Sequence, residues 1–154
     1  GFKNITSVDF SPNVIEAMKQ KYGQTHESLL WQVEDVRNLN GIPDEAFDIV
    51  IDKACLDALV CDEGDPWSPN EQTKNDMEST LKSICRVLKK NNNNNETNIM
   101  ISKKKKKFIS IGFQQPHFRK RYLINENVKY GWEDNLDTYP INVGLGYFYT
   151  VCIA

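Results

Sequence analysis

Short apolar runs alternate with amphipathic stretches along the first ninety residues of the chain. Ile5–Asp9 has the short, β-rich composition of a strand. Ser11 followed by Pro12 is typical of a helix start, and apolar residues then recur at the spacing of one helical face until Gly23. The sequence therefore opens with a predicted strand followed directly by a helix.

Two further strands and a long helix are predicted next. Leu29–Val33 and Phe47–Ile51 are apolar runs of strand length, and each leads into acidic residues. Apolar positions from Met77 to Leu88 keep helical spacing, which predicts a long amphipathic helix. This order of strand, helix and strand is typical of a sheet with parallel strands and helical crossovers.

The last third of the chain has a different pattern. Phe108–Phe113 is a further predicted strand, and Pro116 opens a short basic helix. Tyr130–Tyr139 and Tyr147–Ile153 are aromatic, β-leaning runs with turn-forming residues and no helix between them, so they predict an antiparallel pair at one edge of the sheet. The predicted fold class is α/β, a mostly parallel sheet with a C-terminal antiparallel strand pair, in one domain over residues 1–154.

A low-complexity segment interrupts this pattern at residues 91–107. A run of asparagines, Asn91 to Asn95, is followed by a run of lysines, Lys103 to Lys107. Polar and cationic homopolymers cannot bury apolar surface, so we expect a solvated, disordered insertion. Because no aromatic residue lies among the lysines to stack on bases, nucleic-acid binding is not the favoured role.

Composition limits the class of protein. The 154 residues are 40% hydrophobic and 26% charged with a net charge of −2, which is typical of a soluble globular domain. We expect a cytosolic or nuclear protein, since no apolar run reaches the roughly 18 residues that cross a bilayer and no signal peptide is evident. The four cysteines form no C-x-x-C pair and only two histidines accompany them, so neither a metal site nor a disulfide framework is expected.

Acidic residues follow three of the predicted strands. Ligands of open α/β sheets bind beyond the carboxyl ends of the strands, where Asp9, Asp35 and Asp52 are expected. One carboxylate suits the paired hydroxyls of a ribose, and another, one strand away, can accept from an adenine amino group. The pattern favours an adenosyl ligand, although aspartate is also a common residue where strands end and turns begin.

The chain also resembles a known family. The resemblance is carried by the stretches NITSVDFSP, WQVEDVRNL, FDIVIDKACLDALVCDEGDPW, ICRVLKK and FISIGFQQPHFRKRY. They resemble the class I S-adenosylmethionine-dependent methyltransferases. The phrases D-K-A-C-L-D-A-L and E-G-D-P-W are most similar to the eukaryotic methyltransferase-like proteins that methylate lysines of translation elongation factor 1-alpha. The resemblance implies a Rossmann-like fold, S-adenosyl-L-methionine as cofactor and a protein substrate.

The resemblance implies roles for individual residues as well. Asp9 matches the acid that binds the cofactor ribose, and Phe10 lies beside the adenosine. Asp35 and Val36 match the pair at the edge and face of the adenine. Lys53 matches the residue after the fourth strand of the family, which closes on the cofactor.

Three residues are candidates for the side that receives the methyl group: Asp57, Trp67 and His117. Methyl transfer needs an aligned, uncharged amine, and an aromatic face can hold a cationic or partly methylated amine. Each candidate also has a structural interpretation. Asp57 stabilises a helix start, Trp67 is a hydrophobic plug, and His117 lies near a helix N-terminus. No single catalytic residue is predicted.

The start of the chain departs from the family pattern. Complete members have a strand and a glycine-rich loop first, whereas the eight glycines of this chain form no G-x-G-x-x-G. We therefore expect an N-terminally truncated fragment that binds the cofactor weakly or is inactive as it stands.

Two other classes remain open. A nicotinamide-dependent dehydrogenase would also use Asp9, but none of the six tyrosines is followed four positions later by a lysine. A non-catalytic interaction module derived from a methyltransferase would fit the missing glycine loop.

Overall fold

The computed structural model of the chain describes residues 2, 4–26, 28–89, 107–132, 136–141 and 147–153. The chain divides into two units, Gly1–Ile42 and Pro43–Ala154. Each unit is described by itself, and the single-domain organisation stays a prediction. Within the described ranges, every helix is too short or too polar to cross a lipid bilayer.

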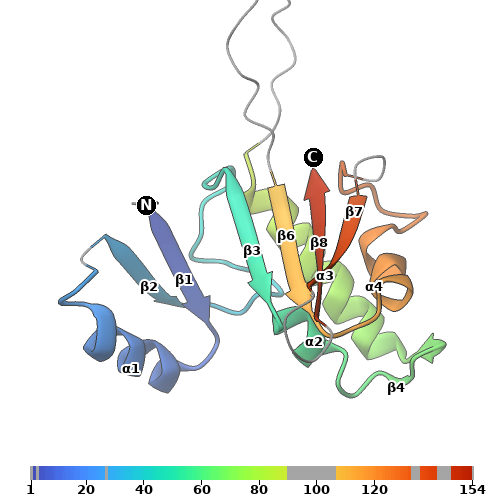
Figure 1. Cartoon of the computed structure of the whole chain (residues 1–154), viewed down its shortest axis with the longest axis horizontal. Coiled ribbons are helices and arrows are strands. Elements are labelled where there is room, and N and C mark those ends of the chain that lie inside the picture. The colour runs from blue at the N-terminus through green and yellow to red at the C-terminus, as the bar shows by residue number, and fades with distance from the viewer. Residues whose placement is uncertain are drawn as a thin grey trace, which may run out of the picture. The chain divides into compact units, whose positions relative to one another are not determined.

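The first unit is a β–α–β arrangement (Figure 1). Its elements are β1 (Ile5–Asp9), α1 (Pro12–Tyr22) and β2 (Leu29–Val33). The Ser11 side chain caps α1 by accepting the Val14 N–H at 3.4 Å. The two strands pair in parallel from Ile5–Leu29 to Asp9–Val33. These elements confirm the strand, helix and strand predicted from the sequence.

The second unit contains the remaining elements. They are β3 (Ile49–Lys53), α2 (Cys55–Leu59), β4 (Gly64–Asp65), β5 (Ser68–Pro69), α3 (Glu71–Val87), β6 (Lys107–Gly112), α4 (Pro116–Leu123), β7 (Leu136–Ile141) and β8 (Tyr147–Ile153). Four strands form a sheet in the order β3-β6-β8-β7, while β4 and β5 form a small hairpin. β3 and β6 are parallel, and β8 is antiparallel to both β6 and β7. The predicted α/β fold with a C-terminal antiparallel pair is confirmed.

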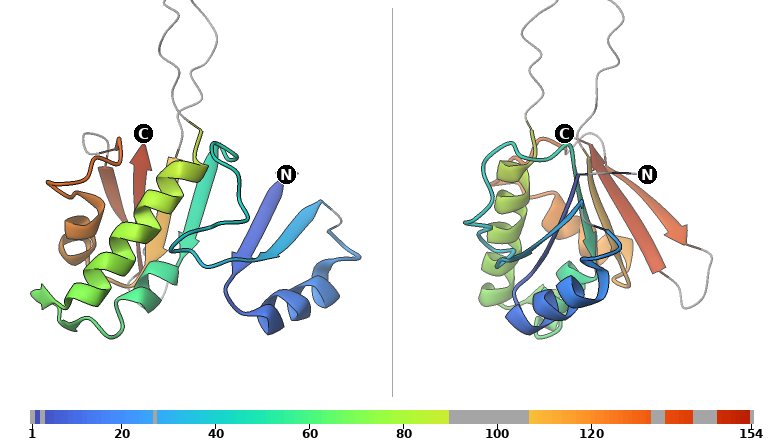
Figure 2. Two further views of the ribbon diagram at one scale, coloured as in Figure 1. Left: turned by 180° about the vertical axis from the view of Figure 1, so that it is seen from behind. Right: turned by 90° about the vertical axis from the view of Figure 1, so that its left-hand side faces the viewer.

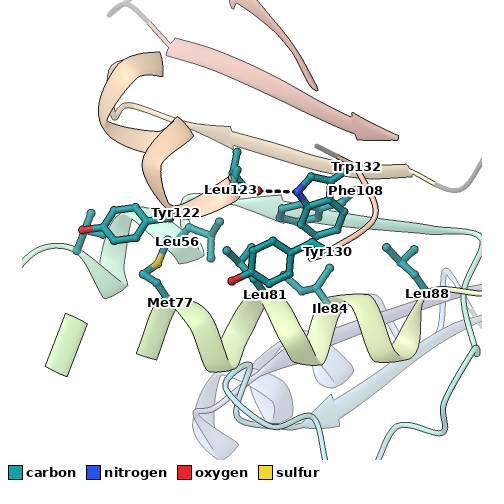
Figure 3. Close-up of a cluster of buried hydrophobic side chains, with 11 residues drawn as sticks. Leu56, Met77, Leu81, Ile84, Leu88, Phe108, Tyr122, Leu123, Tyr130 and Trp132 are labelled. Atoms are coloured by element: carbon teal, nitrogen blue, oxygen red, sulfur yellow. Dashed lines mark hydrogen bonds between the residues drawn. The ribbon is translucent and has the colours of Figure 1, made fainter. Parts of the chain in front are cut away.

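Helix α3 lies across one face of the four-stranded sheet, as both views in Figure 2 show. Its apolar residues Met77, Leu81 and Ile84 are almost completely buried. They point toward the aromatic rings of Phe108, in β6, and Trp132 (Figure 3). The centroids of these two rings are 5.6 Å apart. The helical spacing predicted from the sequence is therefore the packing surface of the second unit.

Figure 3 also shows how the one polar atom of the Trp132 side chain is satisfied. Its Nε1 donates a hydrogen bond to the Leu123 carbonyl oxygen at 2.9 Å. An indole N–H without a partner in such a core would be costly, so this bond fixes the ring against the end of α4. The tryptophan thus joins the segment after α4 to the core.

The predicted strand Tyr130–Tyr139 is wrong in its first half. β7 begins only at Leu136, whereas Tyr130 and Trp132 lie outside any strand and pack in the core with their rings 5.3 Å apart. Aromatic residues have high β propensity because they suit a half-buried pleated surface, but burial elsewhere satisfies them equally well. Composition alone therefore placed the strand too early.

Two other strands begin and end at residues that differ from the prediction. The strand expected at Phe47–Ile51 is β3, Ile49–Lys53; Phe47 instead bridges to Leu88, and its N–H donates to the Val87 carbonyl at 2.9 Å. The strand expected at Phe108–Phe113 is β6, which begins at Lys107, a residue expected in the low-complexity insertion, and ends at Gly112. The rest of that predicted insertion lies outside the described residues. Helix α2 was anticipated only in the structural interpretation of Asp57 at a helix start, and the β4–β5 hairpin was not predicted.

We expect Leu81→Ala to lower the free energy of unfolding by about 2–5 kcal/mol, because the side chain is fully buried against the sheet. Ser79→Ala, on the exposed side of the same helix, is the control and should change it by less than about 0.5 kcal/mol. Urea unfolding followed by circular dichroism measures both. Equal effects of the two substitutions would contradict the packing shown for α3.

Candidate functional site

The carboxyl edge of the β1–β2 pair holds two of the acids predicted to bind a ligand. The strands are parallel and Asp9 is in register with Val33, so both strands end at the same edge. The Glu34 N–H donates to the Asp9 carbonyl oxygen at 3.0 Å, which continues the pairing by one residue. Asp35 follows directly, and the structure thus brings the two predicted acids to one edge of the first unit.

Asp9 has the geometry of a fixed hydrogen-bond acceptor. Its Oδ1 accepts the Ser11 N–H at 2.8 Å, which holds the carboxylate over the start of α1. Its Oδ2 has no partner among the described residues. Phe10 beside it is 79% exposed, which leaves a large apolar surface uncovered next to the carboxylate. A carboxylate oxygen beside an aromatic face suits a ribose and its attached base.

Asp35 is held differently, by an arginine that the sequence did not suggest. Arg37 Nη2 lies 2.6 Å from Asp35 Oδ2, and Arg37 Nε lies 3.0 Å from Oδ1. The hydrogen bonds from the Arg37 guanidinium lower the pKa of Asp35. Any amino group that binds this carboxylate must share it with Arg37. Val36, between the two, is half-buried.

The third strand-ending acid, Asp52, is satisfied within the protein. Its Oδ1 accepts the N–H groups of Cys55 at 2.8 Å and Leu56 at 3.2 Å, and its Oδ2 accepts the Ser110 hydroxyl at 2.7 Å. Burial raises the pKa of Asp52. The carboxylate therefore caps the first turn of α2, and of the two interpretations of a strand-ending aspartate the structural one applies here.

Lys53 is the last residue of β3 and its side chain is exposed. No ion pair links it to another residue in the part of the chain that the structure describes. Its predicted role toward the cofactor stays a prediction, because it belongs to the second unit whereas Asp9 belongs to the first.

Asp57 joins three segments of the second unit. From α2, its Oδ2 accepts the Phe113 N–H at 2.8 Å and its Oδ1 accepts the Gln114 N–H at 3.4 Å, both just after β6. Its Oδ1 also pairs with Arg119 of α4, a side chain that is only 4% exposed. A Cβ on Gly112 would clash with the carboxylate, so the absence of a side chain there lets Asp57 approach the strand end.

These contacts favour a structural role for Asp57. Both oxygens are engaged by donors that fix the turn from β6 to α4, so the carboxylate is poorly suited to take a proton from a substrate. The sequence did not identify Arg119 as its partner. Arg119 belongs to the short basic helix predicted from Pro116, and the structure shows that its side chain is buried and paired with Asp57 of α2. No local signal marks such a pair, because its members are 62 residues apart.

The structure brings the other two acceptor-side candidates together. The rings of Trp67 and His117 stack with centroids 5.9 Å apart, and Phe118 packs edge-on against Trp67 at 4.9 Å. Trp67 is nevertheless 72% exposed, so it does not act as a hydrophobic plug. In the described part of the second unit these residues form an aromatic cluster open to solvent.

Residues 1–92 match the family model described as a methyltransferase domain. The chain is 34% identical over 139 residues to proteins from Bos taurus and Mus musculus, both named EEF1A lysine methyltransferase 4. These alignments cover 90% of this chain and 48% of each relative. The chain thus spans about half the length of the curated relatives it matches.

Solved structures are similar in fold. A SAM-dependent methyltransferase from Aquifex aeolicus superposes with a TM-score of 0.57 at 12% identity, covering 97% of this chain and 68% of the other. A structure described as the DszA carbon methyltransferase gives the same TM-score at 14% identity, with 98% and 40% covered. At such low identity these likenesses concern the fold, which is the Rossmann-like α/β arrangement expected from the sequence.

We expect Asp57→Ala to lower the free energy of unfolding by about 3–5 kcal/mol, because it leaves the buried Arg119 guanidinium without its counter-charge. Asp62→Ala removes an exposed carboxylate nearby in the sequence and should change it by less than about 0.5 kcal/mol. Thermal and urea unfolding measure both variants. If Asp57→Ala kept full stability and lost only activity, the residue would be catalytic rather than structural.

Proposed function

Because this chain belongs to the methyltransferase domain family, we propose that its protein is an S-adenosylmethionine-dependent protein-lysine methyltransferase. The proposed substrate is elongation factor 1-alpha or a similar protein. The observation that carries this proposal is the similarity to the EEF1A lysine methyltransferase 4 proteins, which extends over nearly all of the chain. It includes the D-K-A-C-L-D-A-L and E-G-D-P-W phrases, which lie in the second unit.

The residues of the first unit suit the adenosyl part of the cofactor. Asp9 Oδ2 would accept from the ribose hydroxyls, and Phe10 offers an apolar face beside them. Asp35 and Val36 would border the adenine, although the Asp35 carboxylate is shared with Arg37. When bound, the cofactor supplies an electrophilic methyl group that a neutral amine can accept.

The residues of the second unit would orient the lysine and help to keep it uncharged. A general base is not required if the amine is desolvated near a positive charge, since both effects lower a lysine pKa. Asp57 is engaged by N–H groups and by Arg119, which agrees with a mechanism that does not use it as a base. Its role in this proposal is to hold Phe113 and Gln114 in place beside the acceptor.

The alternatives weighed from the sequence are weaker. Membership of the methyltransferase domain family argues against a nicotinamide-dependent dehydrogenase. A non-catalytic interaction module is not favoured, because the curated relatives matched over most of this chain are named as methyltransferases. Methylation of nucleobases is disfavoured as well. The Asn/Asp-Pro-Pro-aromatic motif expected for it is replaced here by Asp52, Lys53, Ala54 and Cys55.

In the full-length protein, we expect Asp9→Ala to weaken S-adenosylmethionine binding by about 1–3 kcal/mol, because the ribose hydroxyls lose a charged acceptor. Asp35→Ala should weaken it less, since Arg37 already occupies that carboxylate. Isothermal titration calorimetry gives the affinities, with Asp44→Ala as an exposed control outside the predicted site. Equal affinities for wild type and Asp9→Ala would refute the assignment.

We expect the full-length protein to transfer methyl groups to a lysine of a folded protein. The assay incubates it with radiolabelled cofactor, cell lysate or purified elongation factor 1-alpha, and purified RNA, and mass spectrometry then identifies the labelled residue. Label confined to RNA would overturn the proposal. Label on a protein without methyl-lysine would leave the methyltransferase function intact and change the residue type that it modifies.

A further inference from the structure

The β4–β5 hairpin is fixed to α4 by hydrogen bonds at both ends. The Tyr122 hydroxyl donates to Glu63 Oε2 at 2.7 Å, and both side chains are buried. Arg121 Nη1 donates to the Pro66 carbonyl oxygen at 2.6 Å. The hairpin is therefore held in one position by α4, although it consists of very few residues.

This hairpin presents a large aromatic side chain to solvent. Trp67 lies between the two strands, its N–H donates to Asp65 Oδ1 at 2.9 Å, and its ring rests on His117 and Phe118. We call these three aromatic residues the Trp67 platform. Trp67 packs against Phe118, but 72% of Trp67 remains exposed, so packing against Phe118 accounts for only a small part of its surface. Rigid, exposed aromatic surfaces are common centres of protein–protein contacts.

The charges around the platform indicate the sign of its partner. Residues 54–73 contain five acidic residues and no lysine or arginine, whereas α4, which carries His117 and Phe118, adds the basic residues Lys120 and Arg121. Of the five acids, Asp62 and Asp65 are exposed, and both lie shortly before Trp67 in the sequence. Arg121 lies over the Phe118 ring at 5.5 Å, which shows that a cation is accommodated on this cluster. Among the described residues, none places a cation over the Trp67 ring itself.

We propose that the Trp67 platform is a docking surface for a basic, lysine-bearing segment of the protein substrate. A cationic side chain of that segment stacks on Trp67, while Asp62 and Asp65 attract its other positive charges. The same carboxylates repel the phosphates of a nucleic acid, so a protein segment is the occupant that the charges favour. This inference rests on the proposed function for the identity of the substrate, but the docking itself can be measured without catalysis.

The kinetic test compares wild type, Trp67→Ala and Trp67→Phe in the full-length protein with elongation factor 1-alpha as substrate. We expect Trp67→Ala to raise KM for the protein about tenfold, with kcat and the affinity for S-adenosylmethionine unchanged. Trp67→Phe should retain part of the affinity, because it keeps an aromatic face. Tyr139→Ala, an exposed aromatic residue of β7 outside the platform, is the control. An unchanged KM in Trp67→Ala would overturn the proposal.

The binding test needs neither cofactor nor methyl transfer. A short oligolysine peptide is titrated into the protein, and tryptophan fluorescence is followed in wild type and in Trp67→Phe. We expect a saturable change that weakens with added salt and is lost in Trp67→Phe, because Trp132 is fully buried and Trp31 is a half-buried residue of β2, outside the platform. Circular dichroism verifies that the variant is folded.

The outcomes separate the two proposals. No fluorescence response to oligolysine, or an equal response in Trp67→Phe, would overturn the docking surface even if the protein methylates lysine. Tighter binding of a single-stranded RNA oligonucleotide than of oligolysine would overturn it in favour of a nucleic acid. Oligolysine binding through Trp67 without any protein methylation would retain the docking surface and reject the proposed function.

Discussion

The second unit depends on one ion pair, between Asp57 of α2 and the buried Arg119 of α4. Removing two charges from water is costly, and the pair is stable only if its remaining lone pairs and protons are satisfied. Here the Phe113 and Gln114 N–H groups satisfy the carboxylate, whereas Arg119 Nη1 is buried without a hydrogen-bond partner among the described residues. The same contacts set the path of the chain from β6 into α4, which carries His117, Phe118 and the residues that anchor the β4–β5 hairpin.

Local signals explain which parts of the fold could be predicted. β1, α1 and β2 were predicted to the residue, because Ser11, Pro12 and Gly23 mark the helix ends directly in the sequence. The predictions failed where tertiary packing decides. Tyr130 and Trp132 have strand-like composition but fill the core beside Phe108, and no sequence window contains that neighbour.

The candidate site divides in the same way. Asp9 and Asp35 could be placed at one sheet edge because parallel strands end together. The partners of the acids could not be predicted, since a hydrogen bond to a carboxylate leaves no periodic pattern in the sequence. Arg119 pairs with Asp57 from 62 residues away, so no sequence window contains both. Arg37 is only two residues from Asp35, but the sequence does not tell that its side chain turns back to that carboxylate.

A carboxylate whose oxygens are all engaged inside the protein has little capacity left for a ligand. Asp52 and Asp57 are of this kind, and both lie beside strand ends where a ligand-binding acid is expected. Asp9 instead keeps one oxygen without a partner among the described residues, as do the exposed Asp62 and Asp65. Among these five acids, the ones available for recognition lie beside Phe10 in the first unit and beside Trp67 in the second. In each place a carboxylate accompanies an exposed aromatic ring, a combination that suits a nucleoside in the first case and a cationic side chain in the second.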